Sequence, residues 1–137
     1  MLDTKDIVEI YQLEGLCHHA VDHADQSLFP LVFTADARFD GRQTGGPLFE
    51  GIEAIMGFFA LGKPPHPPSH HMTNPWVREE DGRVLVKMKW MVPDPDGGRM
   101  WGGENNDWVV KTDAGWRIKE RVAILLYPAD KRVVPAA

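Results

Sequence analysis

The 137-residue chain lacks several features that would place it in a special class of protein. It has one cysteine, Cys17, so no disulfide can form within the chain, which fits a reducing compartment. Its longest apolar run, residues 122–126, is far too short to span a membrane. The N-terminus has no basic start followed by an apolar run, so we expect no secretion signal. These absences predict a cytoplasmic protein without a membrane partner.

The chain also lacks long runs of charged residues of one sign. Basic and acidic residues are interspersed, and the formal net charge is −5. No basic patch is dense enough to follow a phosphate backbone, so nucleic acid is not an expected partner. Hydrophobic residues make up 43% and charged residues 26% of the chain, which is typical of a globular protein. We therefore expect one domain over residues 1–137, long enough to bury a core.

The first half of the chain carries helical patterns. Apolar residues at helical spacing predict an amphipathic helix over about residues 4–20. A second, short helix is predicted over residues 22–33, with Asp22 in its first turn and Pro30 near its end. Residues 37–41 predict a short strand, and residues 51–62 predict a third helix.

The second half carries strand patterns. Residues 84–92 alternate, which places Val86, Met88 and Trp90 on one face, and two more strands are predicted over 99–111 and 116–127. Short turns at 93–98 and 112–115 connect them as antiparallel neighbours. Helices followed by strands predict an α+β fold: a cone-shaped, curved antiparallel sheet packed with three N-terminal helices. Such a cone is apolar inside and favours a ligand pocket.

Four signatures along the chain resemble the SnoaL-like family of the nuclear transport factor 2-like superfamily. They are residues 20–40 ("AVDHADQSLFPLVFTADARFD"), 49–59 ("FEGIEAIMGFF"), 70–77 ("HHMTNPWV") and 113–122 ("DAGWRIKERV"). The resemblance covers nearly the whole chain and implies a cystatin-like α+β barrel.

The resemblance also implies an active site. Lindane dehydrochlorinase, scytalone dehydratase and the bile-acid dehydratase pair an Asp at the end of the first helix with a His at the start of the strand after the third helix. These positions hold Asp22 and His70 here. Several members add an Arg five residues after the Trp of the last strand, which is Arg121 after Trp116. The three side chains would serve as orienting partner, general base or acid, and electrostatic stabiliser.

These residue types suit proton transfer. A neutral imidazole can take a proton near pH 7, and a carboxylate can fix its tautomer and stabilise the imidazolium. The expected reaction is a cofactor-independent dehydration, dehydrohalogenation or isomerisation of a small, mostly apolar or aromatic cyclic metabolite. Aromatic side chains would line the cavity and contact the substrate. The candidates are Trp76, Trp90, Trp101, Phe58 and Phe59.

Other interpretations stay open. The dehydratases carry a tyrosine at positions that hold Val21 and Cys17 here, so a dehydratase lacks one expected group. Asp40 lies near the base position of ketosteroid isomerase, but its supporting groups are missing. Asp22 can instead cap the second helix. The protein can also be a non-catalytic small-molecule-binding domain, a structural partner subunit such as the dioxygenase β-subunits of this fold, or a polyketide-cyclase-like enzyme.

Two further expectations concern Arg121 and the histidines near residue 20. Regular alternation in the last strand puts Arg121 on the face opposite Ile118, which would exclude it from a pocket on the Ile118 side. His18, His19 and His23 form a cluster in which His19 and His23 have the spacing of helical metal ligands, but the rest of a metal motif is absent, so we expect no metal site. Trp-rich strands and an open curved sheet predict a homo-oligomer.

Overall fold

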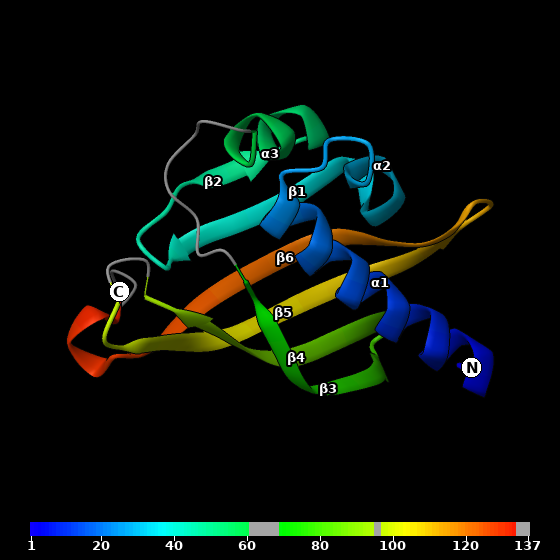
Figure 1. Ribbon diagram of the computed structural model, residues 1–137. Helices are drawn as coiled ribbons and strands as arrows, with labels where there is room; N and C mark the ends of the chain where they lie inside the picture. Colours follow the sequence, from blue (N-terminus) through cyan, green and yellow to red (C-terminus); the bar gives the residue numbers. More distant parts are fainter. Residues whose placement is uncertain (61–68, 95–96, 134–137) are drawn as a thin grey trace.

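The computed structural model describes residues 1–60, 69–94 and 97–133. Within these residues the three helices lie in the first half of the chain together with β1 and β2, and the other four strands follow (Figure 1). The helices are α1 (Thr4–His23), α2 (Phe29–Val32) and α3 (Ile52–Phe58). The strands are β1 (Phe33–Gln43), β2 (Leu48–Glu50), β3 (His71–Glu80), β4 (Arg83–Pro93), β5 (Met100–Thr112) and β6 (Gly115–Tyr127), and the 3-10 turn η1 (Ala129–Lys131) follows them.

The six strands of the described residues form one curved sheet in the order β2-β1-β6-β5-β4-β3. All neighbouring strands are antiparallel except β1 and β6, which run parallel. The predicted α+β class, with three helices and a curved sheet, is therefore confirmed, but the sheet is mixed. β2 pairs with one edge of β1, and β6 reaches the other edge only after a long connection through α3 and β3 to β5, which allows it to lie parallel.

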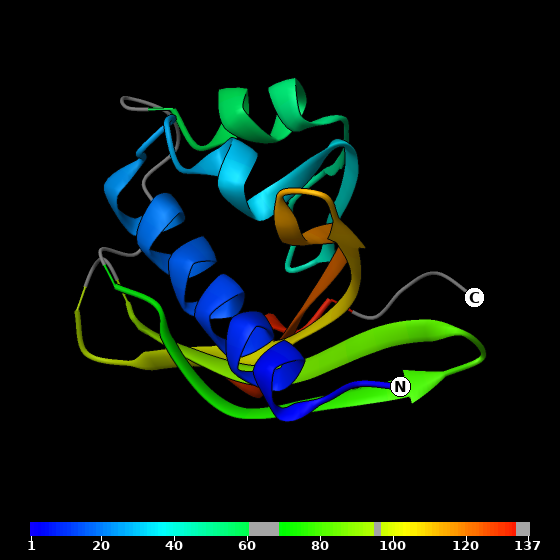
Figure 2. The same cartoon turned by 90° about the vertical axis from the view of Figure 1, so that its right-hand side faces the viewer.

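The core lies between the sheet and the helices. Figure 2 shows α1 running across one side of the curved sheet, with α2 and α3 above it. Ile10 of α1, Phe29 of α2, Met88 of β4 and Ile118 of β6 are fully buried where these layers meet. The alternation predicted for residues 84–92 is confirmed, since Val86, Met88 and Trp90 all point inward. In the described part of the chain, no helix is long and apolar enough to cross a membrane.

Carboxylates fix the start of α1 to the sheet. The backbone N–H of Asp6 donates to Asp3 Oδ1 at 2.8 Å, and that of Asp3 donates to Asp6 Oδ2 at 3.3 Å, which forms a capping box. Asp6 Oδ1 also accepts from Lys111 Nζ at 2.7 Å and from Trp116 Nε1 at 3.1 Å. The first turn of the helix is thereby bound to the turn between β5 and β6.

The end of α1 corrects two predictions. The helix continues to His23 and stops where Ala24 adopts a left-handed conformation (φ 50°). Asp22 therefore lies in the last turn of α1 and does not cap a second helix. Pro30 lies in the first turn of the four-residue α2 and not near its end, because the fixed φ of proline suits the start of a helix. The third predicted helix is shorter than residues 51–62, and residues 61–62 lie outside the described ranges.

Candidate functional site

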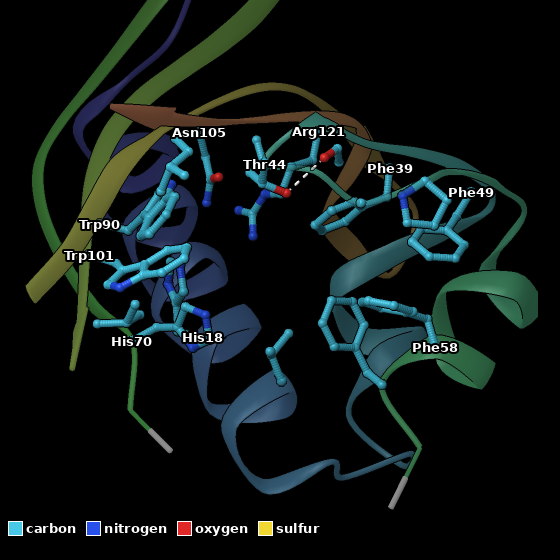
Figure 3. Close-up of a pocket in the computed structure, with 18 residues that line it drawn as sticks. His18, Phe39, Thr44, Phe49, Phe58, His70, Trp90, Trp101, Asn105 and Arg121 are labelled. Carbon is cyan, nitrogen blue, oxygen red and sulfur yellow. Dashed lines mark hydrogen bonds between the residues drawn. The ribbon is translucent and has the colours of Figure 1, made fainter. Parts of the chain in front are cut away.

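A cavity of about 350 Å³ opens between α1, α3 and the inner face of the sheet (Figure 3). This volume lies within the range of small-molecule sites. Its wall is mostly aromatic and aliphatic, and a few polar side chains interrupt it, chiefly His18, His70, Asn105 and Arg121. The other lining residues are Val21, Phe39, Gly41, Thr44, Gly46, Pro47, Phe49, Phe58, Phe59, Trp90, Val92, Trp101, Ala123 and Leu125.

Asp22 and His70 meet at this wall. His70 Nδ1 lies 2.5 Å from Asp22 Oδ1, and the backbone N–H of His70 lies 3.1 and 3.0 Å from the two carboxylate oxygens. An ionised carboxylate can only accept hydrogen bonds, so Nδ1 donates, and in the neutral form of the imidazole Nε2 is left bare. The two side chains are 11% and 19% exposed, so the pair is shielded from bulk water but open on one side.

Local backbone geometry brings the two residues together from 48 positions apart. The left-handed Ala24 turns the chain away at the end of α1, and the N–H of Asp25 returns to the carbonyl of Ala20. The carboxylate of Asp22 in that last turn is thereby left facing the residue that precedes β3. The backbone contact from His70 fixes the entry of that strand, so the imidazole does not depend on its side-chain contact alone.

The segment after His70 explains why the second histidine is not in the site. His71 is exposed, and its Nε2 forms a 3.0 Å hydrogen bond with Ser69 Oγ. Farther along, β3 has a bulge between Thr73 and Trp76, where Asn74 takes a left-handed conformation (φ 54°). Asparagine tolerates that conformation better than most residues. The predicted opposite directions of His70 and His71 agree with this arrangement.

His18 is a cavity residue that sequence reasoning treated only as part of a metal cluster. Its side chain is buried, its Nδ1 lies 2.9 Å from the carbonyl of Glu14, and its ring stacks on that of His70 with centroids 5.8 Å apart. Burial, and secondarily the positive charge of Arg121, lower the pKa of His18 to about 3. The imidazole is therefore neutral near pH 7. A carbonyl can only accept, so Nδ1 donates and Nε2 is the bare nitrogen.

Arg121 borders the cavity but is bound on its far side to a buried group of acids. Its Nε donates to Asp107 Oδ1 at 2.9 Å, and its Nη2 donates at 2.6 Å to both Asp107 Oδ2 and Glu14 Oε2. Its Nη1 donates to Cys17 Sγ at 3.0 Å. One N–H of Nη1 has no partner among the residues that the structure describes.

A bulge in β6 brings Arg121 to the inner face. In the pairing with β5, Trp108 lies opposite Glu120 and Val109 lies opposite Ile118, so one residue, Lys119, is extra. The extra residue reverses the alternation, and Ile118 and Arg121 both point inward. The prediction from regular alternation, which put these two residues on opposite faces, is therefore wrong.

Glu14 completes the buried acid group. Burial and the charge of Asp107 raise the pKa of Glu14 well above its usual value, which favours the neutral form of this carboxyl. Oε1 of Glu14 is buried and has no hydrogen-bond partner among the described residues. Arg121 and Asp107 form an ion pair whose charges compensate each other, and Glu14 lies beside it. The guanidinium thus brings little net charge to the cavity.

Four of the five predicted aromatic contacts line the cavity. Phe58, Phe59, Trp90 and Trp101 do so, whereas Trp76 does not. Its side chain is 59% exposed, with the guanidinium carbon of Arg78 4.7 Å from its ring centroid. The bulge at the start of β3 accounts for this correction, because it changes which residues of that strand face inward.

Glycine makes room for one of these rings. Gly103 lies opposite Trp90 across β4 and β5. A Cβ at Gly103 would stand 2.6 Å from the Trp90 ring and 1.8 Å from the Ile124 carbonyl oxygen. No side chain fits at that position without movement of the backbone, so the indole of Trp90 lies close to the main chain of Gly103.

Sequence reasoning missed Asn105, Phe39, Phe49 and the site position of His18. A signal for His18 was present, because Glu14, His18 and Asp22 follow one another at four-residue spacing and so share one face of α1. Asn105 lies on the inner face of β5 in an otherwise charged and polar stretch, and no pattern distinguished it from Asn106. Asp40, the other candidate acid, pairs with Arg42 Nη2 at 2.6 Å and does not line the cavity.

Comparison with protein families identifies the domain. Residues 3–122 match the model of the SnoaL-like domain. The chain belongs to the SnoaL-like domain family. None of the curated proteins matches it in sequence.

Solved structures resemble this SnoaL-like protein over nearly its full length. A protein from Novosphingobium aromaticivorans, provisionally named an aromatic ring hydroxylase, is 28% identical, with 93% of this chain and 94% of that chain covered and a TM-score of 0.75. Aln2 from a Streptomyces species is 24% identical (91% and 94% covered, TM-score 0.70). A protein of cystatin-like fold from Nostoc punctiforme is 18% identical (93% and 96% covered, TM-score 0.75). The last two likenesses show the fold alone.

The histidines near the end of α1 divide between two sides of the helix. His19 and His23 are exposed and stack on each other with ring centroids 6.2 Å apart, while His18 points to the cavity. In residues 1–60, 69–94 and 97–133, no group of three or more His, Cys, Asp or Glu side chains is placed to hold a metal ion.

Proposed function

We propose that this SnoaL-like protein is a cofactor-independent general acid/base enzyme, a lyase or isomerase, that acts on a small, mostly apolar cyclic substrate. The observation that carries the proposal is the 2.5 Å contact of His70 Nδ1 with Asp22 Oδ1 at the wall of an aromatic cavity. That contact leaves Nε2 of His70 free to take a proton. Asp22 holds the tautomer and stabilises the imidazolium that forms.

In this proposal, the substrate loses a proton from a ring carbon. His70 Nε2 takes the proton, and the electron pair of the broken C–H bond forms a carbon–carbon double bond. A hydroxyl or halide on the next carbon departs with the electron pair of its own bond. In a dehydration the imidazolium returns its proton to the departing hydroxide, and water is released. In a ring that already has a double bond next to the deprotonated carbon, the electron pair forms a new double bond while the old one opens, and the proton returns to the far carbon, which gives an isomerisation.

Arg121 has a smaller part in this proposal than the family resemblance implies. Asp107 already compensates its charge, and four of its five N–H groups have protein partners. The remaining N–H of Nη1 is available to a substrate oxygen that gains negative charge. We therefore assign Arg121 a supporting hydrogen bond in the reaction, and Asp22 and His70 the proton transfer itself.

The cavity wall supports a ring-shaped substrate. Phe39, Phe49, Phe58 and Phe59 form a cluster in which neighbouring rings lie 4.6 to 5.7 Å apart for three of the pairs. Trp90 and Trp101 provide further flat surface. The provisional name of the Novosphingobium structure, an aromatic ring hydroxylase, agrees with a ring as ligand, although it names a different reaction.

Proton abstraction is tested directly by hydrogen–deuterium exchange. A panel of cyclic hydroxyketones is incubated with the protein in D2O, and loss of carbon-bound protons and release of water are followed by proton NMR. His70→Ala and Asp22→Asn should each lower the rate by about 100- to 10,000-fold, the usual contribution of a positioned base. His71→Ala is the matched control, because the exposed His71 does not line the cavity, and its rate should stay within about twofold of the unmodified protein.

Equal rates in the unmodified protein, His70→Ala and Asp22→Asn would overturn the proposal. Tight binding of a panel member without exchange would favour the alternative in which the domain only binds a ring compound, alone or as a partner subunit. Exchange that depends on Asp22 but not on His70 would favour the cyclase alternative, in which an aspartate is the base.

A further inference from the structure

His18 and Asn105 are two polar residues of the cavity wall that the proposed proton transfer leaves unused. They come from different elements, α1 and β5, and are 6% and 5% exposed. Nδ1 of His18 is bonded to the Glu14 carbonyl, whereas its Nε2 and the side-chain amide of Asn105 have no partner among the described residues. Buried polar groups are normally paired, so these two are suited to the polar part of a ligand.

The protonation state of His18 decides what it can bind. Its Nδ1–H donates to a carbonyl, and burial keeps the imidazole neutral, so Nε2 can act only as an acceptor. The group that faces Nε2 must therefore bring its own hydrogen. Asn105 differs, because an amide offers both donors and an acceptor.

The charges around the cavity disfavour an anionic ligand. Asp107 compensates the charge of Arg121 through two hydrogen-bonded nitrogens, so the guanidinium leaves little positive charge for an anion. The remaining charge at the wall is the Asp22 carboxylate behind His70, which repels an anion. A ligand hydrogen-bond donor that is itself neutral meets these conditions, and a hydroxyl group is the simplest one.

We propose that His18 and Asn105 form a hydroxyl-binding subsite, and that the natural ligand is a neutral ring compound with a free alcohol or phenol. The hydroxyl donates to His18 Nε2, and its oxygen accepts from the Asn105 amide. The His18 and His70 rings are stacked 5.8 Å apart, so this subsite adjoins the proton-transfer group and positions the substrate against it. The inference rests on the proposed function only in assuming that the substrate occupies this cavity.

The test compares two probes that differ by one methyl group, 2-naphthol and 2-methoxynaphthalene, by isothermal titration calorimetry at pH 7. The unmodified protein should bind 2-naphthol about 10- to 100-fold more tightly, because the ether cannot donate to Nε2. His18→Phe, which keeps the ring but removes the acceptor, should bring the ratio to about 1. His18→Gln, whose amide oxygen can take the place of Nε2, should restore part of it. Equal affinities in the unmodified protein, or an unchanged ratio in His18→Phe, would overturn the inference.

His70→Ala separates this inference from the proposed catalysis. The probe preference should persist in that variant, and its loss would mean that the hydroxyl binds His70 and not His18. Conversely, exchange rates that are the same in His70→Ala and in the unmodified protein would contradict the proposed reaction. They would not affect the expected preference for 2-naphthol. Nitrogen NMR of the histidines gives a check without any ligand: Nδ1 of His18 must be protonated and Nε2 bare at pH 7, and the opposite tautomer would refute the subsite.

Discussion

Two pairs of a carboxylate and a nitrogen base lie within this small domain, and they differ in what surrounds them. The Arg121, Asp107 and Glu14 side chains are at most 3% exposed, and the guanidinium has partners on nearly all of its N–H groups. Asp22 and His70 are 11% and 19% exposed, and the imidazole keeps one nitrogen without a protein partner among the described residues. The closed pair holds a permanent charge in place, whereas the open pair can exchange a proton with a ligand.

The nature of the base accounts for this division. A guanidinium stays protonated in proteins and forms up to five hydrogen bonds, so it can satisfy several acids in the interior. A histidine changes charge close to neutral pH and has two distinct nitrogens. The fold thus surrounds the guanidinium of Arg121 with buried acids, and leaves the imidazole of His70 partly exposed in the cavity.

The largest expected effect comes from breaking the closed pair. Arg121→Met leaves Asp107 as an unpaired buried charge, so the free energy of unfolding should fall by about 3–5 kcal/mol. His70→Ala should cost about 1 kcal/mol, because Asp22 keeps the His70 backbone N–H and can reach water in the cavity. Urea unfolding at pH 7 measures both values. Equal losses would mean that the two pairs do not differ in the way described.

The next effect concerns acid stability. Histidine normally has a pKa near 6.5, and folding lowers the pKa of His18 to about 3. Between these two pH values His18 is protonated in the unfolded chain and neutral in the folded chain. Stability from the neutral imidazole is complete above pH 6.5 and is lost as pH falls toward 3. Between pH 7.5 and 5 this amounts to about 2 kcal/mol. His18→Phe should remove that part of the pH dependence.

Urea unfolding of the His18→Phe variant at several pH values provides the measurement. His23→Ala is its control, since His23 is exposed, and its pH dependence should match the unmodified protein. A His18→Phe variant that loses stability toward pH 5 as steeply as the unmodified protein would show that His18 is protonated in the fold.

Glu14 should show the opposite dependence on pH. Its raised pKa means that the folded chain holds a proton that the unfolded chain releases above the ordinary glutamic acid range. Its contribution to stability is therefore complete at low pH and is lost as pH rises, at up to about 1.4 kcal/mol per pH unit. Glu14→Gln keeps the shape of the neutral acid without the proton. Its stability relative to the unmodified protein should rise from pH 5 to pH 8, and parallel curves would contradict a protonated Glu14.

The fold and the contact between Asp22 and His70 were predicted from the sequence on two different grounds. Alternation in β4, the early helices and the late strands follow from local periodicity, which a single sequence displays. The meeting of Asp22 and His70, 48 residues apart, does not follow from periodicity; it came from the family resemblance. The homo-oligomer, the cytoplasmic location and the single domain over residues 1–137 stay predictions.

The features that escaped prediction depend on single inserted residues and on burial. Lys119 is one extra residue in β6, and it alone decides whether Arg121 faces the cavity. The bulge before Trp76 similarly changes which residues of β3 face inward. In the sequence, His18 is grouped with His19 and His23 as a candidate metal ligand. In the structure it is buried, whereas the other two are exposed. Bulges and burial depend on the partner strand, so the sequence of one strand does not reveal them.

The smallest effect is expected outside both pairs, at Trp76. Because Trp76 is 59% exposed and away from the cavity, Trp76→Ala should change the free energy of unfolding by about 0.5 kcal/mol or less. It should also leave 2-naphthol binding within about twofold of the unmodified protein. Trp101→Ala is the matched change, because Trp101 lines the cavity, and it should weaken binding about 10-fold. Calorimetry that gave the two variants equal losses would mean that the ring binds on the outer side of β3 and not beside His70.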